Sequence, residues 1–272
     1  MKIVAFVDTL GFKQKISSIN HQEAKLVIQT FNAEIYRLWK FMGYNHDNFI
    51  HGQTFSDSLI IYTENESNDS LRKVLSFLKE LYKVSITICD LPLRGGISIG
   101  DFDRIPATEF DNLQKDLVVG TAFIDAYFLE SANKIKGSKI VFRERIHQTI
   151  QQHLTEFNSK ELVKLENGDI LYEMPWGDIE FLTIKSDSAL SKFISLATKS
   201  KWLDHYYHTL DTFLTKETQK DKHRIFNAIL DKLSTDYKYH DKDNFIEKFL
   251  KTDGIVNLKK SFLSFIRERL EK

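Results

Sequence analysis

The strongest constraint on the fold lies at the start of the chain. Residues 2 to 8, Lys-Ile-Val-Ala-Phe-Val-Asp, form a nearly continuous apolar run that ends in an acid. Such a run is typical of a central strand that is buried on both faces. An aspartate that ends this kind of strand is costly to bury unless it is paired or bound to a metal. The run therefore predicts a sheet that is covered on both faces, with Asp8 at the carboxyl end of its central strand.

Helical and strand patterns alternate after this run, and they predict the class of fold. Apolar residues at spacings of three and four predict helices over 22–42, 69–86, 120–134 and 146–154. Strand patterns cover 48–53, 58–62, 93–100 and 139–142, and a further hairpin ends at Phe181. The first two of these strands meet at the turn-prone residues 54–57. This order predicts an α+β fold, a ferredoxin-like palm with a mixed sheet and helices on one face.

The last third of the chain differs in composition. From about residue 185 onward the segments are Lys-rich and helical, without strand signals. We therefore expect a catalytic domain over 1–185 and a helical C-terminal extension over 186–272, with no internal repeat.

Composition excludes several classes of protein. The 272 residues contain 38 Lys and Arg against 38 Asp and Glu, whereas a surface for duplex nucleic acid needs a basic excess. No apolar run approaches the ~18 residues that span a bilayer, and we expect no leader ahead of the first strand, because no basic start or cleavage site precedes it. Cys89 is the single cysteine, so an intramolecular disulfide is excluded and a reducing compartment is favoured. We expect a cytoplasmic protein that binds neither nucleic acid nor membrane.

Two acids stand where a metal could bind. Asp8 ends the first strand and Asp57 lies at the tip of the hairpin, and in a palm-type sheet these elements are neighbours. Two carboxylates at one edge suit a pair of Mg²⁺ or Mn²⁺ ions that also bind a triphosphate. The alternative is that each acid only caps a helix or stabilises a turn.

Four blocks of sequence resemble the class III nucleotide cyclases. Residues 6–12 (Phe-Val-Asp-Thr-Leu-Gly-Phe) and 54–61 (Thr-Phe-Ser-Asp-Ser-Leu-Ile-Ile) are similar to the two metal motifs of that family. Residues 93–100 (Leu-Arg-Gly-Gly-Ile-Ser-Ile-Gly) resemble its Arg-x-Gly-Ile strand, and 119–131 resemble the helix that follows. In form the blocks look closest to the bacterial pyrimidine cyclases of Pycsar antiphage systems, which make cyclic UMP or cyclic CMP for an effector protein.

The resemblance implies roles for individual residues. Asp8 and Asp57 would be catalytic metal ligands, with the Thr9 carbonyl as a further ligand for Mg²⁺ or Mn²⁺, two ions per site. Beyond what the resemblance implies, we add Arg94 as a catalytic candidate, a donor to the phosphorus in the transition state. The implied contacts with the nucleoside triphosphate come from Leu10, Gly11, Phe12, Lys13, Gln53 and Phe55. Backbone N–H groups near Gly11 would approach the phosphates, because a turn without a side chain permits close contact.

The sequence departs from the family at the third helix. The family's transition-state Asn and Arg positions are occupied by Ile124 and Phe128, and neither side chain donates a hydrogen bond. The purine-selecting Lys position falls on Gln53 and the adenine-selecting Asp position falls on Leu117, so purine selectivity is unsupported. Either turnover has been lost, or other donors such as Arg94, Arg104 or Lys115 stabilise the phosphorus.

These observations lead to an expected activity and its competitors. The favoured hypothesis is a homodimeric cyclase with sites at the interface, which converts UTP or CTP to a 3′,5′-cyclic nucleotide and pyrophosphate as a signal in antiviral defence. One alternative is a purine cyclase, and another is a non-catalytic nucleotide-binding or interaction module on the same palm. A diguanylate cyclase or polymerase palm is disfavoured, because no Gly-Gly-Asp-Glu-Phe signature or basic template-binding region is present.

Overall fold

The first strand lies at the centre of a large sheet. In the computed structural model, β1 (Lys2–Thr9) pairs antiparallel with β3 (Ser58–Thr63) on one side and with β4 (Leu93–Gly100) on the other. Its apolar residues Ile3, Val4 and Ala5 are fully buried. The structure describes residues 1–105, 117–131, 135–177 and 203–213, with 251, 255 and 258–260. The prediction of a central strand ending at an acid is confirmed.

Seven strands form this sheet in the order β2-β3-β1-β4-β7-β9-β8. The added strands are β2 (Ile50–Phe55), β7 (Ile140–Arg143), β8 (Lys160–Lys164) and β9 (Ile170–Met174). Only β4 and β7 run parallel; the other neighbours pair antiparallel. The sheet is therefore mixed, as expected, and the predicted hairpin is the β2–β3 pair.

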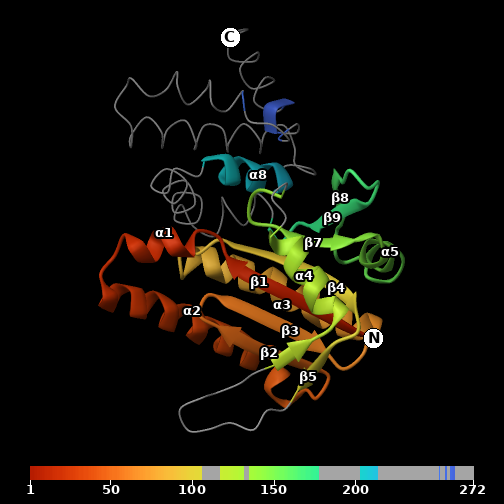
Figure 1. Cartoon of the computed structure of the whole chain (residues 1–272), viewed down its shortest axis with the longest axis horizontal. Helices are drawn as coiled ribbons and strands as arrows, with labels where there is room; N and C mark the ends of the chain where they lie inside the picture. Colours follow the sequence, from red (N-terminus) through yellow and green to blue (C-terminus); the bar gives the residue numbers. More distant parts are fainter. Residues whose placement is uncertain are drawn as a thin grey trace. The chain divides into compact units, whose positions relative to one another are not determined.

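Helices cover both faces of the sheet. Here α2 (His21–Phe41) and α3 (Asn68–Thr87) pack on one face, whereas α4 (Thr121–Ser131) crosses β1 and β4 on the other (Figure 1). Successive residues of a strand point to opposite faces, and a Cβ on Gly95 would meet Tyr82 of α3, while one on Gly96 would meet Ala126 of α4. The helices were expected on one face of the sheet; α2 and α3 share a face, whereas α4, which matches the helix predicted over 120–134, lies on the opposite one.

Close approach of α4 to β4 depends on glycine. A Cβ on Gly96 would lie 2.2 Å from the Ala126 carbonyl oxygen and 2.6 Å from the Leu129 Cβ. The small Ala122 and Ala126 face the sheet and are buried. Because neither side of this contact carries bulk, the backbone of α4 lies directly on β4 and its position follows that of the strand.

Some short elements were not predicted. The α1 helix (Phe12–Ser17) follows β1 after two residues, the 3₁₀ helix η1 covers Tyr44–His46, and β5 (Asp103–Ile105) pairs with β6 (Leu117–Val119) in a separate ribbon. The predicted helix over 146–154 is α5 (Glu144–His153). Residues 178–181 of the predicted second hairpin lie outside the described residues, while β8 and β9 form its body.

The chain divides into two compact units. The first contains Met1–Ser85, Leu91–Ile135 and Lys139–Trp176, and the second contains Ile86–Asp90, Lys136–Ser138 and Gly177–Lys272. The boundary expected at 185 lies outside the described residues. The second unit includes α8 (Leu203–Phe213), where Thr209 Oγ1 accepts a 2.7 Å hydrogen bond from the backbone N–H of Ser138. Within the described ranges, no helix combines the length and apolar character needed to cross a bilayer.

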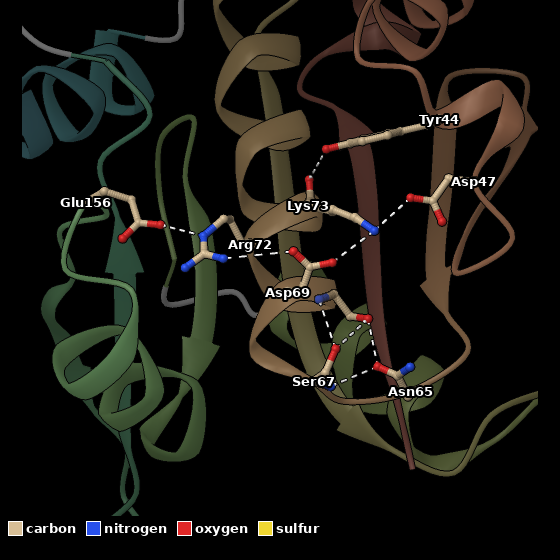
Figure 2. A network of polar contacts seen from close by, with 9 residues as sticks. Tyr44, Asp47, Asn65, Ser67, Asp69, Arg72, Lys73 and Glu156 are labelled. Carbon is tan, nitrogen blue, oxygen red and sulfur yellow. Dashed lines mark hydrogen bonds and ion pairs between the residues drawn. The ribbon is translucent and has the colours of Figure 1, made fainter.

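A polar network fixes the start of α3 at the edge of the first unit (Figure 2). Lys73 Nζ lies 2.8 Å from Asp47 and 3.0 Å from Asp69, and the Tyr44 hydroxyl donates to the Lys73 carbonyl. Arg72 reaches Glu156 at 2.8 Å. These contacts join α3 to η1 and to the segment after α5, so the first turns of α3 are held in place.

Candidate functional site

Asp8 lies at the end of β1 with a hydroxyl donor beside it. It is opposite Ser58 in the β1–β3 register, and the Ser58 Oγ donates a 2.6 Å hydrogen bond to Asp8 Oδ1. This bond fixes the carboxylate and leaves Oδ2 for another partner. The β2–β3 hairpin therefore places the Ser58 hydroxyl beside the Asp8 carboxylate at the end of β1.

Asp57 approaches the same place from the tip of the β2–β3 hairpin. Its Oδ2 accepts a 3.1 Å hydrogen bond from the Thr9 hydroxyl, which belongs to the residue after Asp8. Ser56, just before Asp57, has a φ of 50° in the left-handed region, a conformation that lets a two-residue turn close the hairpin. The two acids that the sequence placed at separate strand ends are thus joined through Thr9 and Ser58.

Burial acts strongly on Asp8. The pKa of this carboxyl is raised from 3.8 to about 6, mainly by desolvation and also by the negative charges of Asp57 and Glu130, against the opposing effects of the Ser58 hydrogen bond and Arg94. Near neutral pH, the ionised carboxylate is consequently held in an environment that disfavours its charge. A cation bound to Asp8 would remove this penalty.

The donor set fits a hard divalent cation. Mg²⁺ is typically held by one or two carboxylates together with substrate phosphates and water, and Asp8 with Asp57 supplies that number. Groups of three or more His, Cys, Asp or Glu side chains arranged for a metal are absent from the described residues. Two carboxylates suit an ion that takes its other ligands from a substrate and water.

The turn after β1 leads into a short helix. Gly11 adopts a φ of 81° and precedes α1, whose first internal bond runs from Lys15 N–H to the Gly11 carbonyl at 3.0 Å. The first N–H groups of a helix have no acceptor within it. Leu10 differs, because its N–H donates to the Pro92 carbonyl at 2.8 Å. Of the predicted phosphate donors, Gly11, Phe12 and the exposed Lys13 therefore lie at the helix start, and Leu10 does not offer its N–H.

Strand register places the other predicted residues on the face of Asp8. Residues paired across an antiparallel sheet share a face, and Asp8 is opposite both Ser58 and Arg94, while Phe55 is opposite Ser58. Gln53 lies two residues before Phe55, opposite Ile60. This is also the face that α4 covers at β1 and β4. The structure thus brings Gln53, Phe55 and Arg94 to one face with Asp8.

Arg94 makes a bond that the sequence did not reveal. Its Nε and Nη2 donate to Glu130 Oε1 of α4 at 2.8 and 2.6 Å, and only 5% of Glu130 is exposed. One turn earlier, Asp125 of the same helix accepts from Arg143 Nη2 at 2.7 Å and from Ser98 at 2.9 Å. Two arginines of the sheet therefore hold α4, one next to Asp8 and one farther along.

The outward face of α4 is apolar. Ile124 is 52% exposed and Phe128 is 61% exposed, with Tyr127 between them. Tyr127 also packs edge-on against Phe6 of β1, with ring centroids 5.3 Å apart. The β5–β6 ribbon adds Ile105, Leu117 and Val119, which are about half exposed. Neither Ile124 nor Phe128 contributes a polar group to the site around Asp8.

Two residues of the site, Ser58 and Glu130, were not singled out from the sequence. Both lie within the blocks that resemble cyclases, and Glu130 is an acid near the end of a mostly apolar helix. That pattern is a usable signal, because a buried acid requires a partner. It does not identify the partner, since Arg94 is 36 residues away in sequence.

Comparisons with known proteins give a likeness in structure. No protein-family model matches the chain, and no curated protein matches it in sequence. The adenylyl cyclase CyaB from P. aeruginosa is similar with a TM-score of 0.50 and 13% identity, over 64% of this chain and 92% of that chain. A dimeric guanylyl cyclase domain of the RhoGC fusion protein from the aquatic fungus Blastocladiella emersonii has a TM-score of 0.49 and 16% identity, over 64% and 94%. The likeness to the first confirms the fold class, a mixed α+β palm of the ferredoxin-like type.

Proposed function

We propose that this chain is a nucleotidyl cyclase, which converts a nucleoside triphosphate to a 3′,5′-cyclic nucleotide and pyrophosphate. The observation that carries the proposal is the convergence of Asp8 and Asp57, joined through Ser58 and Thr9 at one end of the sheet. The similarity of the fold to an adenylyl cyclase supports it. So do the four sequence blocks, because all of them contribute to the same face or edge.

The residues have distinct roles in this proposal. Asp8 and Asp57, with the Thr9 carbonyl, hold Mg²⁺ or Mn²⁺, which when bound lowers the pKa of the attacking 3′-hydroxyl and neutralises the phosphates. Gly11 and Phe12 orient the triphosphate by their backbone N–H groups, and Lys13 adds positive charge beside it. Ser58 keeps one oxygen of Asp8 in place. Because the nucleophile and the phosphorus belong to one molecule, positioning supplies much of the acceleration.

We favour UTP or CTP as substrate, by resemblance to the pyrimidine cyclases. Gln53, at the position where purine enzymes carry Lys, lies on the face of Asp8 and Phe55, where an amide can both donate to and accept from a base edge. A purine triphosphate is the alternative. In the same proposal the enzyme works in the cytoplasm as a source of a cyclic nucleotide for an effector protein in antiviral defence.

A homodimer is part of the proposal. Ile124 and Phe128 of α4 are exposed apolar residues, and exposed apolar patches on soluble proteins mark interaction sites. A head-to-tail pair would place α4 of one subunit against the metal site of the other. The active site would then be completed at the interface.

The experiment follows from the chemistry. Purified protein is incubated with ATP, GTP, CTP and UTP in turn, with Mn²⁺, and pyrophosphate and cyclic product are measured. We expect one pyrimidine triphosphate to be converted, and we expect Asp57→Ala and Asp8→Ala to abolish conversion. Conversion that survives Asp57→Ala would contradict the metal assignment, and preference for ATP or GTP would contradict the pyrimidine choice.

A nucleotide-binding module without turnover is the second candidate. It is favoured by Ile124 and Phe128, which supply no donor, and by the engagement of Arg94 with Glu130. That candidate predicts no product from any triphosphate, but thermal stabilisation by nucleotide with or without a divalent metal. The two functions therefore differ in both the product assay and the metal dependence of binding.

A further inference from the structure

Arg94 lies opposite Asp8 across the β1–β4 pair. The two residues share a face of the sheet, and the Cβ atoms of such pairs lie about 4.5–5.5 Å apart. An arginine in this place is well positioned to pair with the aspartate. Such a pair would occupy the carboxylate that the proposed function assigns to a metal.

The guanidinium is directed elsewhere. Its Nε and Nη2 both donate to Glu130 Oε1, while Asp8 Oδ1 accepts from Ser58. Among the side chains that the structure describes, Arg94 makes no hydrogen bond to Asp8. Because only 6% of the Glu130 side chain is exposed, this acceptor sits in a fixed position on α4.

The position of Glu130 depends on the close contact between α4 and β4. Gly96 lies two residues after Arg94 on the same face, and its missing side chain lets Ala126 and Leu129 approach the strand. Glu130 follows Leu129 directly. The helix therefore brings a carboxylate within hydrogen-bonding distance of the Arg94 guanidinium.

We infer that Glu130 is a positioning residue that sequesters Arg94 and thereby keeps Asp8 open to a divalent cation. The inference rests on the proposed function, in which Asp8 binds a metal. In the absence of the Glu130 carboxylate, Arg94 turns to Asp8, the acid opposite it on β1, and competes with the metal. Glu130 thus acts on the site through Arg94 and does not touch the ligands.

The test measures Mn²⁺ binding without nucleotide, from the loss of the electron paramagnetic resonance signal of the free ion. Glu130→Gln keeps the shape of the side chain and removes its charge, and we expect about tenfold weaker Mn²⁺ binding, within the range of coupling between contacting residues. A simple loss of negative charge would also weaken binding. Arg94→Gln is therefore measured alone and in the Glu130→Gln background.

The double-mutant cycle separates the two explanations. Sequestration predicts that Arg94→Gln improves binding far more in the Glu130→Gln background than in the wild type, whereas simple charge effects are additive. Additivity within about twofold overturns the inference. Arg94→Lys adds a variant with unchanged net charge: a single ammonium loses the two-donor bond to Glu130, and we expect it to weaken Mn²⁺ binding. If Glu130→Gln does not fold, the test rests on Arg94→Lys, and Mn²⁺ binding by Arg94→Lys that equals binding by the wild type overturns the inference.

The matched control is Asp125→Asn, which removes the partner of Arg143 on the same helix. It tests whether a weaker attachment of α4 to the sheet is by itself enough to weaken Mn²⁺ binding. We expect a lower melting temperature with unchanged Mn²⁺ binding. Equal weakening by Asp125→Asn would overturn the inference. The proposed function fails separately, if the wild type shows no Asp57-dependent Mn²⁺ site or no product from any triphosphate.

Discussion

Ser58 and Asp8 face each other across the β1–β3 pair, and the serine hydroxyl donates a 2.6 Å hydrogen bond to the carboxylate. The same strand pairing that buries the core thus also fixes the acid at its end. Asp8 combines a constrained geometry with a pKa raised to about 6, mainly by desolvation. Stability and proposed function therefore make opposite demands on this residue.

The raised pKa predicts how stability depends on pH. A carboxyl with a pKa of 3.8 in the unfolded chain and about 6 in the folded protein binds its proton more tightly when folded, so its contribution to stability is lost as the pH rises through 6. Asp8→Asn removes this effect. In the absence of metal, we expect the melting temperature of Asp8→Asn to exceed that of wild type at pH 7 by a few degrees, with the difference shrinking towards pH 4.

Calorimetric scans of both proteins between pH 4 and 7.5, with chelator, measure this difference. Added Mn²⁺ should raise the melting temperature of the wild type and leave Asp8→Asn unchanged, because a ligand that binds only the folded state stabilises it. A difference between the two proteins that does not vary with pH would be inconsistent with the assigned titration of Asp8.

Removal of the Ser58 hydroxyl should shift the acid limb of the activity profile. The hydrogen bond from Ser58 lowers the pKa of Asp8, so Ser58→Ala should raise that pKa further. At pH 6.5 we expect about tenfold lower activity than wild type, because a bond to a charged acceptor is lost, with a smaller loss at pH 8. The pH dependence of kcat/KM checks this, with Ser56→Ala in the adjoining turn as a control; parallel profiles would rule the role out.

Hydrophobic periodicity was sufficient to predict much of the scaffold. The helix expected over 22–42 is α2, His21–Phe41, and the strand over 93–100 matches β4. These elements follow from local spacing because one face of each is buried by the sheet or the helices. The convergence of Asp8 and Asp57 was also foreseen, since it requires only that a hairpin lie next to the first strand.

Contacts between distant segments were beyond the sequence. Gly95 faces α3 and Gly96 faces α4, on the opposite side of the sheet. Two adjacent glycines in a sequence do not show which helix lies on which face. Leu10 N–H is occupied by the Pro92 carbonyl, 82 residues away in sequence, and no local pattern indicates such a bond. The β5–β6 ribbon was missed because three-residue strands carry too little periodicity to detect.

Gly96→Ala should displace α4. The added Cβ would lie 2.2 Å from the Ala126 carbonyl oxygen, a contact that only movement of backbone can relieve. We expect a loss of about 1–3 kcal/mol in the free energy of unfolding, the usual cost of overpacking a core, and a loss of activity because Glu130 moves with the helix. Urea unfolding measures the first and the cyclisation assay the second.

Gly168→Ala is the matched control for that substitution. Gly168 has a φ of 90° but no atom within 4 Å of the added Cβ. It should lose about 1 kcal/mol of stability through backbone strain alone and retain full activity, since it lies between β8 and β9. An equal loss of activity in the two variants would show that the effect of Gly96→Ala is not specific to α4.

The apolar face of α4 should control self-association. Phe128 is 61% exposed, and a charge placed at the centre of an apolar interface must be desolvated without a partner. We therefore expect the wild type to be a dimer at micromolar concentration, and Phe128→Glu to be a monomer with less than a tenth of its activity. Light scattering after size-exclusion chromatography gives the mass. Phe41→Glu, at an 81% exposed position on α2, should leave both unchanged. A monomeric wild type that cyclises a triphosphate would show that the site is complete within one chain.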